Sequence, residues 1–174
     1  MAAPAPPAPE AADPQLGPLL QSFVACVAAE LAAAGRPPCA ACLVWGNSYP
    51  PADFCDCDCA NGHGQAWVRL VRLDPAATGN RIAMKKCQPV RVRAWVEAGV
   101  YRCVPTVGPD GSSAPTCEQR SAAAWGFLAD ARALRTAFAC CEALGDRPKE
   151  LMSEDPIGSL GGCAGVALQF TVDL

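Results

Sequence analysis

The chain has 174 residues, of which 51% are hydrophobic and 18% charged, with a net charge of -3 and a pI of about 5.1. This length and composition suit one domain with a substantial core. The acidic balance excludes the usual nucleic-acid surface, which concentrates Lys and Arg, so no sequence-specific nucleic-acid partner is expected. No export leader or uninterrupted apolar span is recognised, so we expect a soluble, unexported protein with no membrane partner.

Residues 1–15 are almost entirely Ala and Pro, which predicts a disordered arm before a single domain at 16–174. Asp13 and Pro14 are typical of a capped helix start. An apolar stripe at helical spacing follows, and Gly35 predicts the end of this first helix. The stripe consists of Leu16, Leu20, Phe23, Val27 and Leu31.

Residues 39–63 hold five of the twelve cysteines and the only histidine, and they predict a long Cys-rich loop. The spacing of Cys39 and Cys42 favours a zinc-binding turn, whereas the closer spacing of the cysteines from 55 to 59 is irregular for zinc. The candidate structural zinc ligands are Cys39, Cys42, Cys55, Cys59 and His63. Disulfides and free thiols are the alternatives. A redox site is disfavoured, because the CxxC pair follows a helix instead of opening one.

Residues 42–45 and 65–73 predict two strands, and the second is apolar on both faces, as in the interior of a sheet. Residues 90–101 alternate between core-forming and polar or aromatic side chains, and the predicted strand extends over 90–104. At ~3.3 Å per residue this strand would extend about 50 Å, which exceeds the usual length. It therefore either contains a bulge at Gly99 or projects to pair with another subunit.

The outward face of that long strand is a candidate subunit interface. Its residues are Arg91, Arg93, Trp95, Glu97 and Tyr101. Aromatic side chains in a row on a surface more often mark an interface than a solvated face. The alternative is a solvated face, on which ion pairs contribute only ~0–1 kcal/mol each.

Thr116 and Gln119 predict a capping box that starts a second long helix ending at Gly145. Residues 146–160 are polar and predict a loop, and residues 166–174 alternate as a final strand. The apolar stripe of the second helix is Phe127, Ala131, Leu134, Phe138 and Cys141. The predicted fold class is α+β, with two long helices packed on one face of a mixed, mostly antiparallel sheet and a long Cys-rich loop.

Catalytic patterns are missing from the sequence. The only histidine lies in a Gly-His-Gly turn, and no phosphate-binding loop, dinucleotide glycine motif or HExxH is present. We therefore expect no catalytic residues and no enzyme activity.

Three segments occur together in a familiar order: GQAWVRL at 64–70, GVYRCVP at 99–105, and GGCAG at 161–165 before the final strand. Together they resemble the tail terminator proteins of long-tailed bacteriophages that infect actinobacteria. The resemblance covers about residues 19–174. It implies a structural virion subunit of α+β fold, without catalytic residues, that forms a homo-oligomeric ring of six copies.

The resemblance further implies that the ring lies at the head-proximal end of the tail, ends tail-tube polymerisation and joins the tail to the head connector. The implied partners are other copies of the chain, the major tail tube protein and a head-to-tail connector or stopper protein, with DNA passing through the ring. Assembly would take place in the host cytoplasm. The alternatives are another connector subunit, a stopper or adaptor, and a zinc-stapled interaction module.

Overall fold

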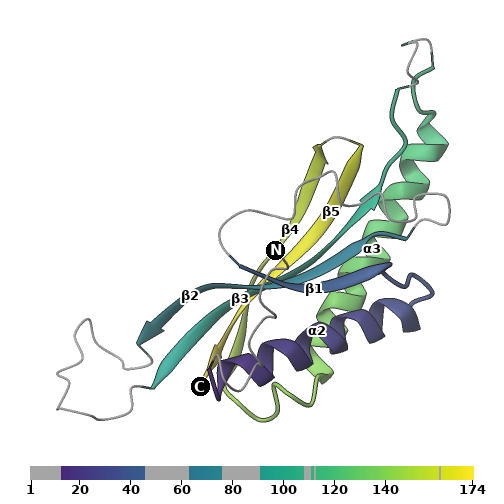
Figure 1. Cartoon of the computed structure of the whole chain (residues 1–174). Coiled ribbons are helices and arrows are strands. Elements are labelled where there is room, and N and C mark those ends of the chain that lie inside the picture. The colour runs from purple at the N-terminus through teal and green to yellow at the C-terminus, as the bar shows by residue number, and fades with distance from the viewer. Residues whose placement is uncertain (1–12, 46–62, 76–90, 108–110, 112, 161) are drawn as a thin grey trace, which may run out of the picture.

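The computed structural model describes residues 13–45, 63–75, 91–107, 111, 113–160 and 162–174. The elements are α2 (Leu16–Ala33), β1 (Ala40–Trp45), β2 (Gln65–Pro75), β3 (Val92–Cys103), α3 (Cys117–Cys140), β4 (Lys149–Leu160) and β5 (Cys163–Asp173). The strands form one sheet in the order β1-β2-β3-β5-β4. β1 and β2 are parallel and the other pairs are antiparallel. Both helices lie on the same face of the sheet (Figure 1).

The first helix begins and ends as its sequence predicts. The Asp13 side chain accepts hydrogen bonds from the backbone N–H groups of Gln15 and Leu16, at 2.9 and 2.7 Å. At the other end Gly35 has a φ of 73°, and the N–H of Arg36 donates to the carbonyl of Leu31. This left-handed glycine closes the helix. Every residue of the predicted apolar stripe is buried.

α2 bears on the expectation that the chain has no membrane-spanning segment. Its 18 residues have a mean hydropathy of 1.6, so the helix is long and apolar enough to cross a membrane by length and composition alone. In this structure its apolar face packs against the sheet, because seven of its side chains are buried there. The core helix of a soluble protein and a signal sequence near an N-terminus both pass this test of length and composition.

The second helix starts with the predicted capping box. The N–H of Gln119 donates to the Thr116 hydroxyl, and the N–H of Thr116 donates to the Gln119 side chain. The helix ends at Cys140, earlier than the predicted stop at Gly145. Cys141 has an extended backbone and bonds to Cys26 of α2. The Cys26–Cys141 disulfide therefore connects α2 to the residue directly after the end of α3.

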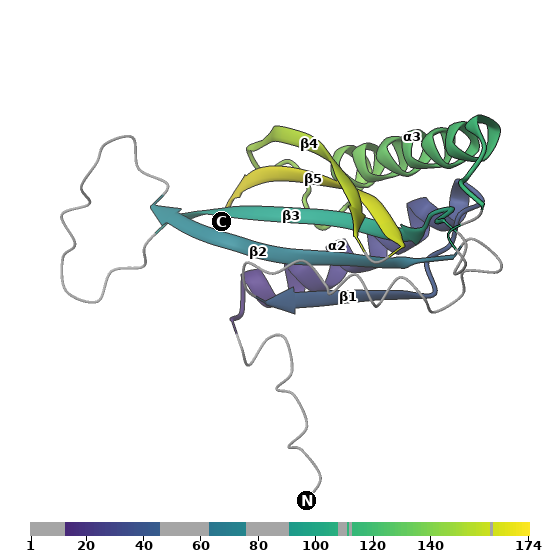
Figure 2. The same cartoon turned by 90° about the horizontal axis from the view of Figure 1, so that it is seen from above.

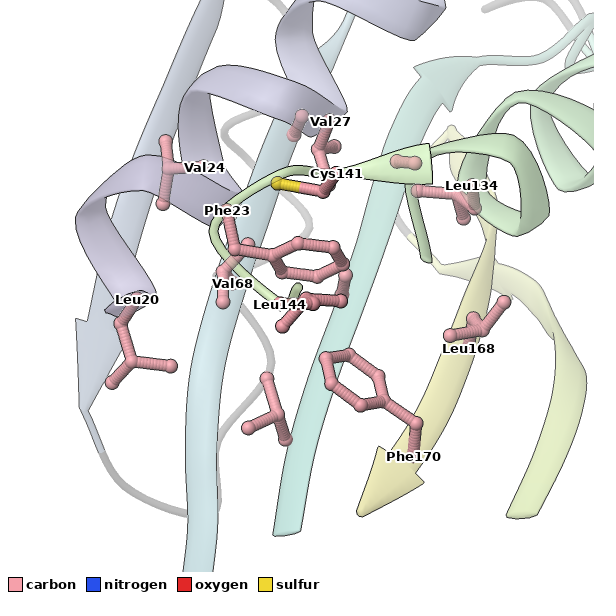
Figure 3. Packing of buried hydrophobic residues seen from close by; sticks show 14 of the residues in the cluster. Leu20, Phe23, Val24, Val27, Val68, Leu134, Cys141, Leu144, Leu168 and Phe170 are labelled. Atoms are coloured by element: carbon pink, nitrogen blue, oxygen red, sulfur yellow. The ribbon is translucent and has the colours of Figure 1, made fainter. Parts of the chain in front are cut away.

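The main core fills the space between the two helices and the sheet (Figure 3). The rings of Phe23 from α2 and Phe170 from β5 meet edge to face at 5.0 Å, and Phe138 of α3 lies 5.1 Å from Phe170. The alternation predicted for β3 and β5 is confirmed. Their buried core residues are Ala94, Val96, Ala98, Val100, Val166, Leu168, Phe170 and Val172.

The predicted fold class is wrong as stated and needs correction. The α+β class and the mixed sheet hold, but the fold is not built on two long helices: strands take 42% of the described residues and helices 34%. Residues 149–160, predicted as part of a polar loop, form the edge strand β4. β4 is an edge strand that pairs only with β5, and its exposed side can carry polar residues and proline. Because Glu150, Glu154 and Pro156 occur along it, its sequence does not alternate between apolar and polar residues as a half-buried strand would.

β3 crosses Gly99 without a bulge. Gly99 is paired in register with Trp67 of β2 and with Ala167 of β5. The irregularity lies instead in β2, between Leu70 and Arg72. Figure 2 shows that the ends of β2 and β3 project beyond the helices. β3 is paired within the chain along its length, with β2 from Val92 to Tyr101 and with β5 from Arg93 to Cys103, so its pairing with another subunit stays a prediction.

Candidate interaction surface

A second, smaller core lies on the face of the sheet that turns away from the helices. Trp67 and Tyr101 are 1% and 4% exposed, and their rings stack with centroids 4.8 Å apart. A Cβ on Gly99 would overlap the Trp67 ring, one on Gly64 the Tyr101 carbonyl, and one on Gly165 the Val100 carbonyl. Residues from the three segments that carry the phage resemblance therefore meet in one packed cluster. Packing explains why each of these glycines is needed.

Glu97 lies beside this cluster and is fully buried. Its carboxylate accepts two hydrogen bonds from Arg69, at 2.7 and 2.9 Å. The Trp67 indole N–H and the Gln169 amide also donate to it, at 3.3 and 2.8 Å. The charge is thus surrounded by four donors, as a buried carboxylate requires.

At the projecting end, the described residues on the same face of the sheet are partly exposed. Arg91 is exposed, and Arg93 forms an ion pair with Asp173 at 2.6 Å. The Arg72 guanidinium lies 4.0 Å from the centre of the Trp95 ring. The Trp95 indole N–H is buried and has no hydrogen-bond acceptor among the residues that the structure describes. Such an unsatisfied donor is unusual in a finished core.

The five predicted interface residues therefore lie in two environments. They share one face of β3, but Glu97 and Tyr101 are buried within the single chain. Arg91, Arg93 and Trp95 lie at the projecting end, where the face is partly exposed. Sequence reasoning missed Arg69 as the partner of Glu97. The pairing register of β2 and β3 would have revealed this contact, because it places Arg69 directly opposite Glu97.

A second buried ion cluster also escaped the sequence analysis. Asp130 of α3 is fully buried and binds Arg102 of β3 with both carboxylate oxygens, at 2.7 and 2.8 Å. Arg36 also donates to Asp130, at 2.9 and 3.2 Å. The Arg36 guanidinium lies across Gly126, where a Cβ would press against it. This cluster ties the end of α2 to α3 and β3.

Disulfides link several parts of the described chain. Cys26 and Cys141 are bonded to each other, and Cys39, Cys103 and Cys163 are also disulfide-bonded. The described free thiols are Cys42, Cys117 and Cys140. Stable disulfides are rare in a reducing cytosol.

The described members of the candidate zinc set are not gathered around one point. Cys39 is disulfide-bonded, whereas Cys42 has a free thiol on β1. β1 begins directly after Cys39, so the pair spans a strand and not the tight turn that would bring both sulfurs to one ion. His63 precedes β2, and Cys55 and Cys59 lie outside the described residues. Within the described ranges no group of three His, Cys, Asp or Glu could hold a metal ion.

The Cys26–Cys141 disulfide should contribute strongly to stability, because it joins residues 115 positions apart. Replacing both cysteines with Ala is expected to lower the free energy of unfolding by about 2–4 kcal/mol, since the unfolded chain regains conformational entropy. Denaturant unfolding measures the loss. Cys140→Ala is the matched control, because this adjacent thiol is exposed and free. Equal stability of the double variant and the control would contradict the prediction.

The Arg93–Asp173 pair predicts a pH dependence. The hydrogen bond from Arg93 lowers the pKa of the Asp173 carboxyl below its usual value. Its stabilising contribution is therefore complete above the unfolded pKa of ~3.9 and is lost as the pH falls through the lower folded pKa. The stability difference between wild type and Asp173→Asn should be constant above about pH 5 and shrink below about pH 4. Urea unfolding across this range tests it, and a difference that grows on acidification would be inconsistent with the pair.

The two edges of the sheet differ in chemistry. β4 carries Lys149, Glu150 and Pro156, and its pairing with β5 shifts register twice. Charges, proline and irregular register protect an edge against pairing with another chain. β1 has the sequence AACLVW, with no charge or proline, and among the described residues it pairs only with β2. The edge of β1 is thus the one suited to strand addition.

Comparison with known proteins does not assign a family to this arrangement. No protein-family model and no curated protein sequence matches the chain.

Proposed function

We propose that this chain is a structural subunit of a homo-oligomeric ring, acting as the tail terminator of a long-tailed phage. The observation that carries the proposal is the end of β2 and β3 that projects beyond the helices (Figure 2). On the face of the sheet away from the helices, this end carries Arg93 and the partly exposed Trp95, next to the exposed Arg91. Apolar and aromatic groups beside arginines are typical of interface cores.

A closed ring needs two different patches on every subunit, because each copy contacts its neighbours head to tail. The projecting end of β2 and β3 supplies one patch. The edge of β1 supplies the other, since its backbone is unprotected by charge or proline. Strand addition between these patches would extend the sheet from one subunit to the next.

The buried acidic groups support a structural role. Glu97 and Asp130 are fully buried, and each is held by arginine. Bidentate contacts from Arg69 and Arg102 occupy the oxygens of these two carboxylates. These two carboxylates therefore stabilise the fold, and the exposed surface of the subunit binds partners.

In the proposed ring, six copies end polymerisation of the tail tube and join it to the head connector. One side of the ring contacts the last ring of major tail tube protein. The other contacts the connector or stopper protein, and DNA passes through the centre. The phage resemblance of segments 64–70, 99–105 and 161–165 supports these partners.

Light scattering on the purified full chain tests the ring. We expect a discrete mass of several copies, and Arg91→Glu should lower it, because this exposed residue lies at the projecting end. Arg147→Glu is the matched control, since it reverses an exposed charge in the turn before β4. A strict monomer at all concentrations that is also missing from virions would disprove the proposal.

Cryo-EM of assembled virions separates a terminator from the neighbouring alternatives. A terminator contacts the last ring of tube subunits, whereas a stopper or adaptor lies on the head side of it. A ring without tube contact would therefore replace the terminator assignment with another connector role.

A further inference from the structure

An apolar groove opens where α2 begins and where β1 and β2 run past the helix. Its volume is about 440 Å³. Its apolar lining is Leu16 and Leu20 of α2, Leu43, Val44 and Trp45 of β1, and Leu70 and Leu73 of β2. Val44 lines the groove and packs against the Trp67–Tyr101 cluster as well.

Three of its lining residues are unusually exposed for their type. Leu43 and Leu73 are each 45% exposed, and Trp45 is 85% exposed. Single exposed apolar residues are ordinary, but several gathered around one groove indicate a binding surface. The groove therefore needs an occupant of apolar character.

The chain itself supplies a segment of suitable chemistry at the right place. Asp13, which caps α2, also lines the groove. Residues 1–12, with the sequence MAAPAPPAPEAA, directly precede it and contain a single charged side chain, Glu10. Twelve residues in a polyproline conformation reach about 37 Å at ~3.1 Å per residue. This length is ample for an arm that starts at the rim.

The groove also has the type of surface that proline-rich segments bind. Such segments dock in apolar grooves lined by aromatic side chains, because proline rings stack on an aromatic face and the polyproline helix loses little entropy. Trp45 offers this face, and Leu43 and Leu73 flank it. Proline cannot donate backbone hydrogen bonds, so the arm fits the groove and not the edge of β1.

We propose that residues 1–12 dock in the apolar groove of their own chain, with prolines of the arm against Trp45. Tethering at Asp13 favours the arm of the same chain, because a short link gives an effective concentration of about millimolar. The docked arm shields Leu43, Trp45 and Leu73, which lie beside the unprotected edge of β1. This inference does not depend on the proposed ring.

Site-specific photo-crosslinking in the full chain tests the docking. A benzophenone amino acid replaces Ala5, and mass spectrometry identifies the crosslinked peptides. We expect crosslinks within one chain to peptides that contain Trp45 or Leu73. Trp45→Ala should reduce their yield at least fivefold. Trp125→Ala is the matched control, because this α3 tryptophan is 71% exposed and lies outside the groove, and it should leave the yield unchanged.

Each other outcome would overturn the inference. Crosslinks between chains would show exchange of arms, and crosslinks unaffected by Trp45→Ala would place the arm elsewhere. A full chain without any crosslink to the groove would also refute it. Near-ultraviolet circular dichroism confirms that Trp45→Ala is folded.

A second measurement uses a chain that starts at Asp13. This chain retains the whole main core, which begins at Leu16. Removing the arm should increase binding of an apolar fluorescent dye severalfold, and Trp45→Ala in the shortened chain should reverse much of the increase. Equal dye binding by the full and shortened chains would contradict a docked arm.

Discussion

Asp130→Ala is expected to lower the free energy of unfolding by about 3–5 kcal/mol, because removing one partner of a buried ion pair leaves the other charge in a site of low polarity. Arg102 is 2% exposed and Asp130 is fully buried, so water cannot replace the lost contacts. Arg36 would lose its bonds to the same carboxylate, but it is 30% exposed and can turn to solvent. Denaturant unfolding measures the effect.

The matched control is Glu154→Ala, which breaks the surface pair with Arg135. The Arg135 side chain is 48% exposed, so this change should cost no more than about 1 kcal/mol. A loss for Asp130→Ala as small as that of the control would mean that the buried cluster does not hold α2, α3 and β3 together.

Glu97→Leu should destabilise the protein by a similar amount, about 3–5 kcal/mol. The substitution removes the acceptor of four hydrogen bonds at the centre of the sheet. Arg69 is only 7% exposed, so the cost arises mainly from its buried charge. Asp74→Asn is a suitable control, because its pair with Arg72 is 43–55% exposed and should contribute less than about 1 kcal/mol.

A double variant identifies the source of that loss. Arg69→Met combined with Glu97→Leu removes both charges while keeping side chains of similar size. Apolar replacement of a whole buried pair is often neutral or stabilising. The double variant should therefore be more stable than Glu97→Leu alone. Additive losses from the two single changes would show that packing and not charge explains the effect.

The candidate interface shows where sequence reasoning stops. Alternation correctly placed Arg93, Trp95, Glu97 and Tyr101 on one face of β3, because neighbouring side chains of a strand point to opposite sides. It did not reveal that Glu97 and Tyr101 are covered while Arg93 remains partly exposed. Burial depends on what packs over a face, and that information is not local.

Local physics accounts for what the sequence by itself determined. The α2 stripe, the Thr116–Gln119 capping box, Gly35 and the alternation of β3 and β5 each depend on residues a few positions apart. The helix and strand periods and the capping box all involve residues within a few positions of one another. These elements can therefore be predicted from the local sequence.

Only the tertiary structure decided the long-range partners. Asp130 meets Arg36 across 94 positions, and Cys26 meets Cys141 across 115. The polar segment 149–160 likewise forms a strand because it pairs with β5, and its own sequence pattern does not predict this. A charge, a thiol or a backbone edge can be satisfied by many partners. The topology of the sheet and helices selects one of them.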